Sequence, residues 1–148
     1  MSKKFFLDTN VLLYQLDITD VRKQAIANDL VRLAISEGNG CISYQVVQEC
    51  LNVLTRKASV VLDAVSAQRY LDVVLAPLIS VPASVNLFHE GLSLQQRYRF
   101  SFYDSMIIAA AQASGSATLY SEDMQHGQMV GSLRVINPFL TSDSKQLV

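Results

Sequence analysis

The chain has 148 residues, half of them hydrophobic, and a net charge of −1. These values predict one domain with a sizeable core, and the near-zero charge gives no global sign of nucleic-acid binding. The two cysteines lie in apolar surroundings, which excludes a disulfide framework and a metal knuckle. Neither a secretory signal nor an apolar run long enough to span a membrane is present, so we expect a soluble, cytoplasmic protein.

Short apolar runs alternate with helical patterns along the chain, which predicts an α/β fold. About five short strands are expected, at 5–7, 41–42, 78–81, 117–120 and 133–136, and helices are expected at about 11–16, 21–36, 44–56, 62–75, 84–97 and 103–113. Pro77 should end the fourth of these helices, and 121–131 should form a polar loop. We expect a single domain over residues 1–140 and a loose C-terminal tail over 141–148.

Asp8 comes directly after the first apolar run and precedes a helical pattern. Ligands of open α/β sheets collect just beyond the carboxyl ends of the strands, so Asp8 is a candidate site residue. An aspartate before a helix is also a good N-cap, and the position alone fits both roles equally well.

Glu49 lies inside an otherwise apolar helical pattern, one step outside its apolar stripe. The ordinary alternative is a surface residue paired with Arg56 or Lys57, because charged residues are mostly exposed.

Asp104 falls on one helical row with Ile107, Ile108 and Ala111, which points it toward the interior. Ser101 and Asp104 also fit a capping box, and that would account for the acid without any function.

Asp123 follows the fourth predicted strand through Ser121 and Glu122. It is a second acid just beyond the carboxyl end of a strand, although a solvated turn explains it equally simply. Ser121 and Asp123 would share one side of an extended segment, with Glu122 on the other. The sequence leaves Asp123 and Glu122 as competitors for the same role.

The joint occurrence of these acids is more informative than any one of them. Clustered carboxylates repel one another and raise their own pKa values, so a cluster is tolerable when a cation lies among them. Oxygen ligands without nearby cysteine or histidine favour Mg²⁺ or Mn²⁺. Two such ions could activate a water and stabilise the leaving oxygen in phosphodiester cleavage.

Four segments, in order, resemble the motifs of the PIN domain family and cover nearly the whole chain. They are Leu7-Asp8-Thr9-Asn10-Val11-Leu12, Gln48-Glu49 with Asn52-Val53-Leu54, Phe102-Tyr103-Asp104-Ser105-Met106-Ile107-Ile108-Ala109-Ala110-Ala111, and Leu119-Tyr120-Ser121-Glu122-Asp123-Met124 with Gly127. The single-domain size is similar to that of VapC-type toxins of bacterial toxin–antitoxin pairs.

The resemblance implies a three-layer α/β/α sandwich with a central parallel sheet and a Mg²⁺- or Mn²⁺-dependent endoribonuclease. Carried over by position, the catalytic and metal-binding acids are Asp8, Glu49, Asp104 and Asp123, supported by Asn10 and Ser121. Water would attack the phosphorus in line and leave a 5′-phosphate and a 3′-hydroxyl. A small antitoxin is an expected partner, inserting Arg or Lys over the acidic pocket, and a homodimer is expected because PIN domains often pair.

RNA contacts must come from local groups, because the net charge is near zero. Arg97 and Arg99, near Tyr98 and Tyr103, are candidates for a phosphate-and-stacking patch, although solvated loop residues are the ordinary alternative. His126 is better explained as a plain loop residue than as a ligand.

Two other classes of function compete with a nuclease. Aspartyl-phosphate enzymes use a strand-end aspartate as nucleophile, but Asn10 stands where haloacid-dehalogenase phosphatases carry a second aspartate. The other is a non-catalytic PIN-like module that binds nucleic acid or protein.

Overall fold

The computed structural model describes residues 3–56 and 62–140. The strands are β1 (Phe5–Leu7), β2 (Gly40–Ser43), β3 (Ile79–Val81), β4 (Thr118–Tyr120), β5 (Met129–Val130) and β6 (Leu133–Ile136). The helices are α1 (Thr9–Tyr14), α2 (Val21–Ser36), α3 (Tyr44–Leu54), α4 (Ala64–Tyr70), the π-helical turn η1 (Leu71–Leu75), α5 (Ala76–Leu78), α6 (Val85–Tyr98) and α7 (Phe102–Ala113). The expected C-terminal tail, 141–148, and Lys57 lie outside the described residues.

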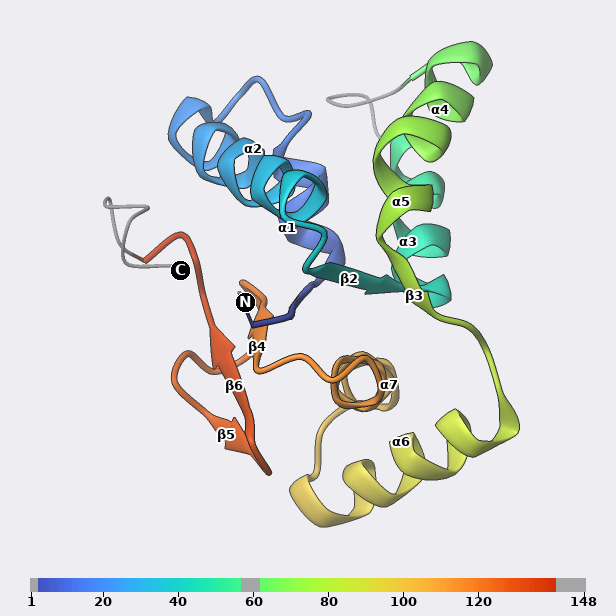
Figure 1. Ribbon diagram of the computed structural model, residues 1–148, viewed down its shortest axis with the longest axis vertical. Coiled ribbons are helices and arrows are strands. Elements are labelled where there is room, and N and C mark those ends of the chain that lie inside the picture. The colour runs from blue at the N-terminus through green and yellow to red at the C-terminus, as the bar shows by residue number, and fades with distance from the viewer. Residues whose placement is uncertain (1–2, 57–61, 141–148) are drawn as a thin grey trace.

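One six-stranded sheet, in the order β3-β2-β1-β4-β6-β5, organises the fold. Every neighbouring pair is parallel except β5 and β6. α1 and α2 lie on one side of the sheet, and α7, with α6 packed against it, lies on the other (Figure 1). This is the expected α/β sandwich with a mainly parallel sheet.

β1 lies inside the sheet and has no exposed face. Phe5, Phe6 and Leu7 are at most 6 % exposed, because both faces of this strand are covered by helices. A wholly apolar strand is typical of parallel sheets buried on both faces. The helix α7 continues this core, since Ser105 through Ala111 are all buried. The core therefore fixes where β1 ends and where α7 begins.

Two details of the sequence-based expectation are wrong. β5 falls in the stretch expected to be a polar loop, and its two residues pair antiparallel with β6 across a turn in which Gly131 has φ 61°. Two residues are too few to show the alternation that marks a strand. Pro77 does not end the helical run, because the run continues from η1 through α5 and ends at Leu78.

No helix within residues 3–56 and 62–140 combines the length and the apolar character needed to cross a bilayer.

Candidate active site

The sheet brings the ends of β1 and β4 together at the point where the strand order reverses. β2 and β3 lie on one side of β1, and the chain then returns through α6 and α7 to place β4 on its other side. The backbone N–H of Asp8 donates to the carbonyl of Tyr120 at 3.0 Å, so the two strand ends are hydrogen-bonded to each other. Such a switch point is where open α/β sheets bind ligands.

Asp8 is buried at this point, with 6 % of its surface exposed. Its Oδ1 accepts the Thr9 backbone N–H at 2.7 Å, as an N-cap of α1 does, and its Oδ2 accepts the Ser121 hydroxyl at 2.7 Å. The pKa of Asp8 is raised to about 6, mainly by burial and to a lesser extent by the charges of Glu49 and Asp104, while the two hydrogen bonds oppose the rise. Asp8 is therefore an N-cap and also the buried centre of a group of acids.

Glu49 is on α3, and the Thr9 side chain, next to Asp8, links it to the end of β1. The Thr9 hydroxyl donates to Glu49 Oε1 at 3.3 Å, and the Gln45 side-chain amide donates to the same oxygen at 3.1 Å. Arg56 donates to Asn52 rather than to Glu49. Glu49 is thus half-buried and linked to the end of β1, which does not match the alternative of a surface ion pair with Arg56.

Asp104 lies in the first turn of α7. Ser101 caps this helix, because its Oγ accepts the Asp104 backbone N–H at 3.1 Å. The return contact of a capping box is not formed, since the Asp104 carboxylate accepts no hydrogen bond from any residue in 3–56 or 62–140. The half-buried carboxylate contributes instead to the field at Asp8.

Asp123 and Glu122 face different partners. The side-chain amide of Asn10 donates to Asp123 Oδ2 at 2.8 Å. Glu122 accepts the Tyr14 hydroxyl at 2.7 Å and forms an ion pair with Lys23. Asp123 is exposed and beside α1, whereas Glu122 is already neutralised by a lysine, so the geometry favours Asp123 as the fourth acid.

Thr9, Gln45 and the pair formed by Tyr14 and Lys23 orient the acids, and the sequence did not single them out for this role. Gln45 and Glu49 have the i, i+4 spacing at which helical side chains meet, which is a usable signal. Tyr14 and Lys23 lie 108 and 99 residues from Glu122, so no local pattern connects them with it.

The acids suit a hard cation, because all of their donor atoms are carboxylate oxygens. No three acidic, histidine or cysteine side chains among residues 3–56 and 62–140 are grouped closely enough to hold one ion by themselves. Mg²⁺ is commonly held by one or two carboxylates, with waters and substrate phosphates completing its ligands. The residues therefore fit an ion shared with water and substrate rather than one enclosed by protein.

The candidate RNA-binding residues lie around the start of α7. Arg97 and Arg99 are exposed, and neither guanidinium makes a hydrogen bond or ion pair to a described residue. Tyr98 is half-buried and stacked on Phe100, with ring centroids 5.4 Å apart, so one face of its ring is already covered. Tyr103 is 68 % exposed.

His126 has a structural contact, in line with the plainer of its two interpretations. Its Nδ1 accepts the Asn137 backbone N–H at 3.0 Å.

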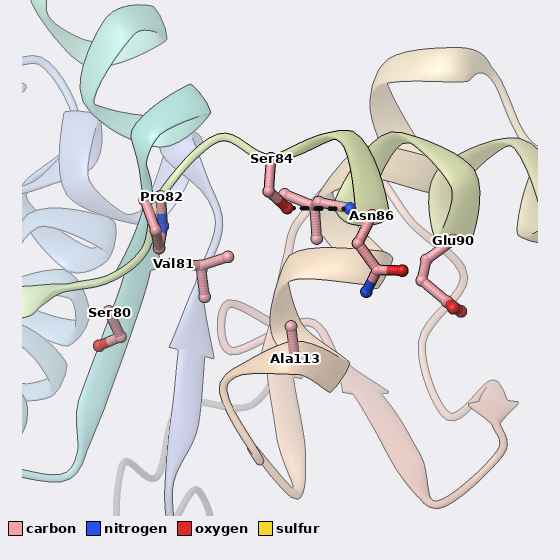
Figure 2. Close-up of a pocket in the computed structure, with 8 residues that line it drawn as sticks. Ser80, Val81, Pro82, Ser84, Asn86, Glu90 and Ala113 are labelled. Carbon is pink, nitrogen blue, oxygen red and sulfur yellow. Dashed lines mark hydrogen bonds between the residues drawn. The ribbon is translucent and has the colours of Figure 1, made fainter.

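Two hollows differ in their relation to the acids. A groove of about 340 Å³ between α3 and α7 includes Glu49 in its wall. A second hollow, of about 230 Å³, lies where β3 leads into α6 and includes Ala113 (Figure 2). Ala113 ends α7, nine residues or roughly 13 Å along the helix from Asp104. The groove between α3 and α7 is therefore the one that adjoins the acids.

A family model of the PIN domain matches residues 5–129, so the chain belongs to the PIN domain family. Comparison with curated proteins found no matching sequence.

Solved structures share the fold at low sequence identity. VapC20 of Mycobacterium tuberculosis, described as a sarcin–ricin loop cleaving toxin, has a TM-score of 0.60 at 20 % identity, covering 81 % of this chain and 90 % of its own. A toxin–antitoxin complex from Klebsiella pneumoniae has a TM-score of 0.64 at 19 % identity, covering 91 % and 98 %. FitAcB from Neisseria gonorrhoeae has a TM-score of 0.62 at 19 % identity, covering 93 % and 99 %.

Proposed function

We propose that the chain is a Mg²⁺- or Mn²⁺-dependent endoribonuclease, with Asp8, Glu49, Asp104 and Asp123 as its catalytic and metal-binding acids. The observation that carries this proposal is the buried carboxylate of Asp8 at the switch point of the sheet, with its pKa raised by burial and by Glu49 and Asp104. A structural N-cap needs neither this burial nor two further acids facing it. Membership of the PIN domain family supports the same chemistry.

The chain's own residues hold and orient the acids. Ser121 and the Thr9 N–H each bind one oxygen of Asp8, so its carboxylate has a fixed direction. Thr9 and Gln45 do the same for Glu49, and Asn10 for Asp123. A bound divalent ion would supply the activation of a water and the stabilisation of the leaving oxygen.

We further propose that the nuclease is the VapC-type toxin of a toxin–antitoxin pair, acting on RNA in the cytoplasm. Its support is the shared fold with VapC20, described as a toxin, and with a toxin–antitoxin complex. The expected partner is a small antitoxin that places an Arg or Lys over the acids, where the charges of Glu49 and Asp104 already act on Asp8. A homodimer stays a prediction.

Purified protein incubated with structured RNA tests the activity. Cleavage is expected with Mn²⁺ or Mg²⁺ and none with EDTA, and the new ends should be a 5′-phosphate and a 3′-hydroxyl. Ends bearing a 2′,3′-cyclic phosphate, or equal cleavage in EDTA, would contradict the proposal. Co-expression with the product of a neighbouring gene, followed by co-purification, tests the toxin assignment separately.

A further inference from the structure

The groove between α3 and α7 has a wall of a distinctive chemical kind. Gln45, Gln48, Glu49, Asn52 and Tyr103 line it. The four residues from α3 follow the i, i+3, i+4, i+7 spacing, so they form one face of that helix. Three of the four are amides, and the fourth is the acid shared with the proposed active site.

The amides of this face are not equally engaged. Gln45 is buried, and its side-chain amide donates hydrogen bonds to Glu49 and to the backbone carbonyl of Tyr103. The bond to Tyr103 links α3 to α7. Gln48 is exposed and makes no side-chain hydrogen bond to a described residue. Asn52 is exposed, and only its oxygen is used, by Arg56 at 3.4 Å. Gln48 and Asn52 therefore present donors and acceptors to whatever enters the groove.

Tyr103 provides an aromatic surface on the opposite wall. Its ring meets Phe102 in an edge-to-face contact with centroids 5.3 Å apart, and 68 % of the residue stays exposed. Few aromatic residues in the described chain are as exposed, and this one lies next to Asp104 in the sequence.

These groups suit a base better than a phosphate. A phosphate is bound mainly by cations and by N–H groups, and the groove contributes amides, a phenol ring and one acid. An unpaired nucleobase has a π face that stacks on tyrosine and an edge that both donates to and accepts from amides.

We propose that the groove between α3 and α7 binds an unpaired nucleobase of the RNA beside the cleaved phosphodiester, stacked on Tyr103 and hydrogen-bonded by Gln48 and Asn52. The inference rests on the proposed nuclease function, and it assigns the preference for particular bases to this groove. The substrate class is then single-stranded RNA or an unpaired loop, since a base in a duplex exposes neither its face nor its pairing edge.

Binding measured without cleavage tests the inference. Fluorescein-labelled RNA decamers of each single base, and a decamer with abasic positions, are titrated with the full chain in EDTA, and anisotropy gives the affinities. Tyr103→Ala should weaken binding of the base-bearing decamers roughly 5- to 100-fold, and Tyr103→Phe should keep it. Binding of the abasic decamer should not change. Gln48→Ala and Asn52→Ala should alter the ranking of the four bases, and Gln68→Ala, an exposed amide on α4, is the matched control.

The outcomes separate this inference from the proposed function. If the wild type cleaves RNA with metal but Tyr103→Ala, Gln48→Ala and Asn52→Ala bind all decamers as the wild type does, the groove assignment is overturned and the nuclease stands. If these variants lose an antitoxin-like protein partner while RNA binding is unchanged, the groove is a protein site and the inference also fails. A wild type that neither binds nor cleaves RNA overturns both.

Discussion

Asp8 is held out of water by the packing around the end of β1, although it would be charged if exposed. The cost of ionising it in the fold is the reason that its pKa rises from 3.8 to about 6. A difference of this size corresponds to roughly 3 kcal/mol between the two protonation states. The stability that protonated Asp8 contributes is fully present below pH 3.8 and is lost as the pH rises through about 6.

Asp8→Asn should therefore stabilise the metal-free protein at neutral pH. In EDTA at pH 7.5 we expect the free energy of unfolding to rise by about 1–3 kcal/mol, less any loss from a weakened bond to Ser121. The gain should shrink as the pH falls from 7 to 5, because wild-type Asp8 then takes up a proton. Urea denaturation at several pH values measures this, with the exposed Asp29→Asn on α2 as control. A variant less stable than the wild type at every pH would show that the Asp8 carboxylate is a structural cap first.

Arg99 has φ 61°, in the left-handed region that favours glycine, at the C-terminal end of α6. A side chain in this conformation costs roughly 1 kcal/mol, so its presence suggests a use for the guanidinium. Arg99→Gly should raise the free energy of unfolding by about that amount and weaken RNA binding several-fold. Thermal denaturation and anisotropy on the same sample decide the matter. Higher stability with unchanged RNA affinity would make Arg99 an ordinary loop residue.

At the scale of elements, side chains of α1 bind two successive acids in the loop that follows β4. Asn10 and Tyr14 are one helical turn apart, and they bind Asp123 and Glu122 respectively. Lys23 of α2 completes the contact, with its ammonium 4.6 Å from the centre of the Tyr14 ring. Because these contacts keep Asp123 beside Asn10, we propose that Glu122 is a positioning residue.

Glu122→Gln and Asp123→Asn should behave differently. Asp123→Asn should reduce RNA cleavage at saturating substrate by at least about 100-fold, because it removes one of the acids proposed to bind the metal. Glu122→Gln should reduce it about 10-fold or less and cost no more than about 1 kcal/mol of stability, since the ion pair with Lys23 is partly exposed. Raising the Mn²⁺ concentration should restore part of the activity of Glu122→Gln only. A larger loss in Glu122→Gln than in Asp123→Asn would make Glu122 the fourth acid.

The elements that the sequence predicted well are those with a long or wholly apolar pattern. β1 and α2 begin and end where the apolar run and the Asp20 cap indicated, and the buried row of α7 follows its helical spacing. β5 was missed because two residues carry no periodicity. The different surroundings of Asp123 and Glu122 could not be predicted locally, since Lys23 is distant in sequence and near Glu122 only after folding.

At the scale of the whole molecule, the strand order puts three of the four acids on elements that meet at one edge of the sheet. Asp8 follows β1, Glu49 is on the helix after β2, and Asp104 begins the helix that leads to β4. The chain's net charge of −1 provides little attraction for RNA at a distance, so affinity has to come from close contacts. The central claim is that these acids form a metal-dependent catalytic site.

Cleavage of one structured RNA in Mn²⁺ tests that claim most directly. The proteins compared are the wild type, Asp8→Asn, Asp104→Asn and the control Asp29→Asn. A thermal transition first shows that each of them is folded. We expect the wild type and Asp29→Asn to cleave at equal rates, and both site variants to lose at least about 100-fold while staying folded. Full activity in a folded Asp8→Asn or Asp104→Asn variant would contradict the account, because the acids would then be structural and the activity would belong elsewhere.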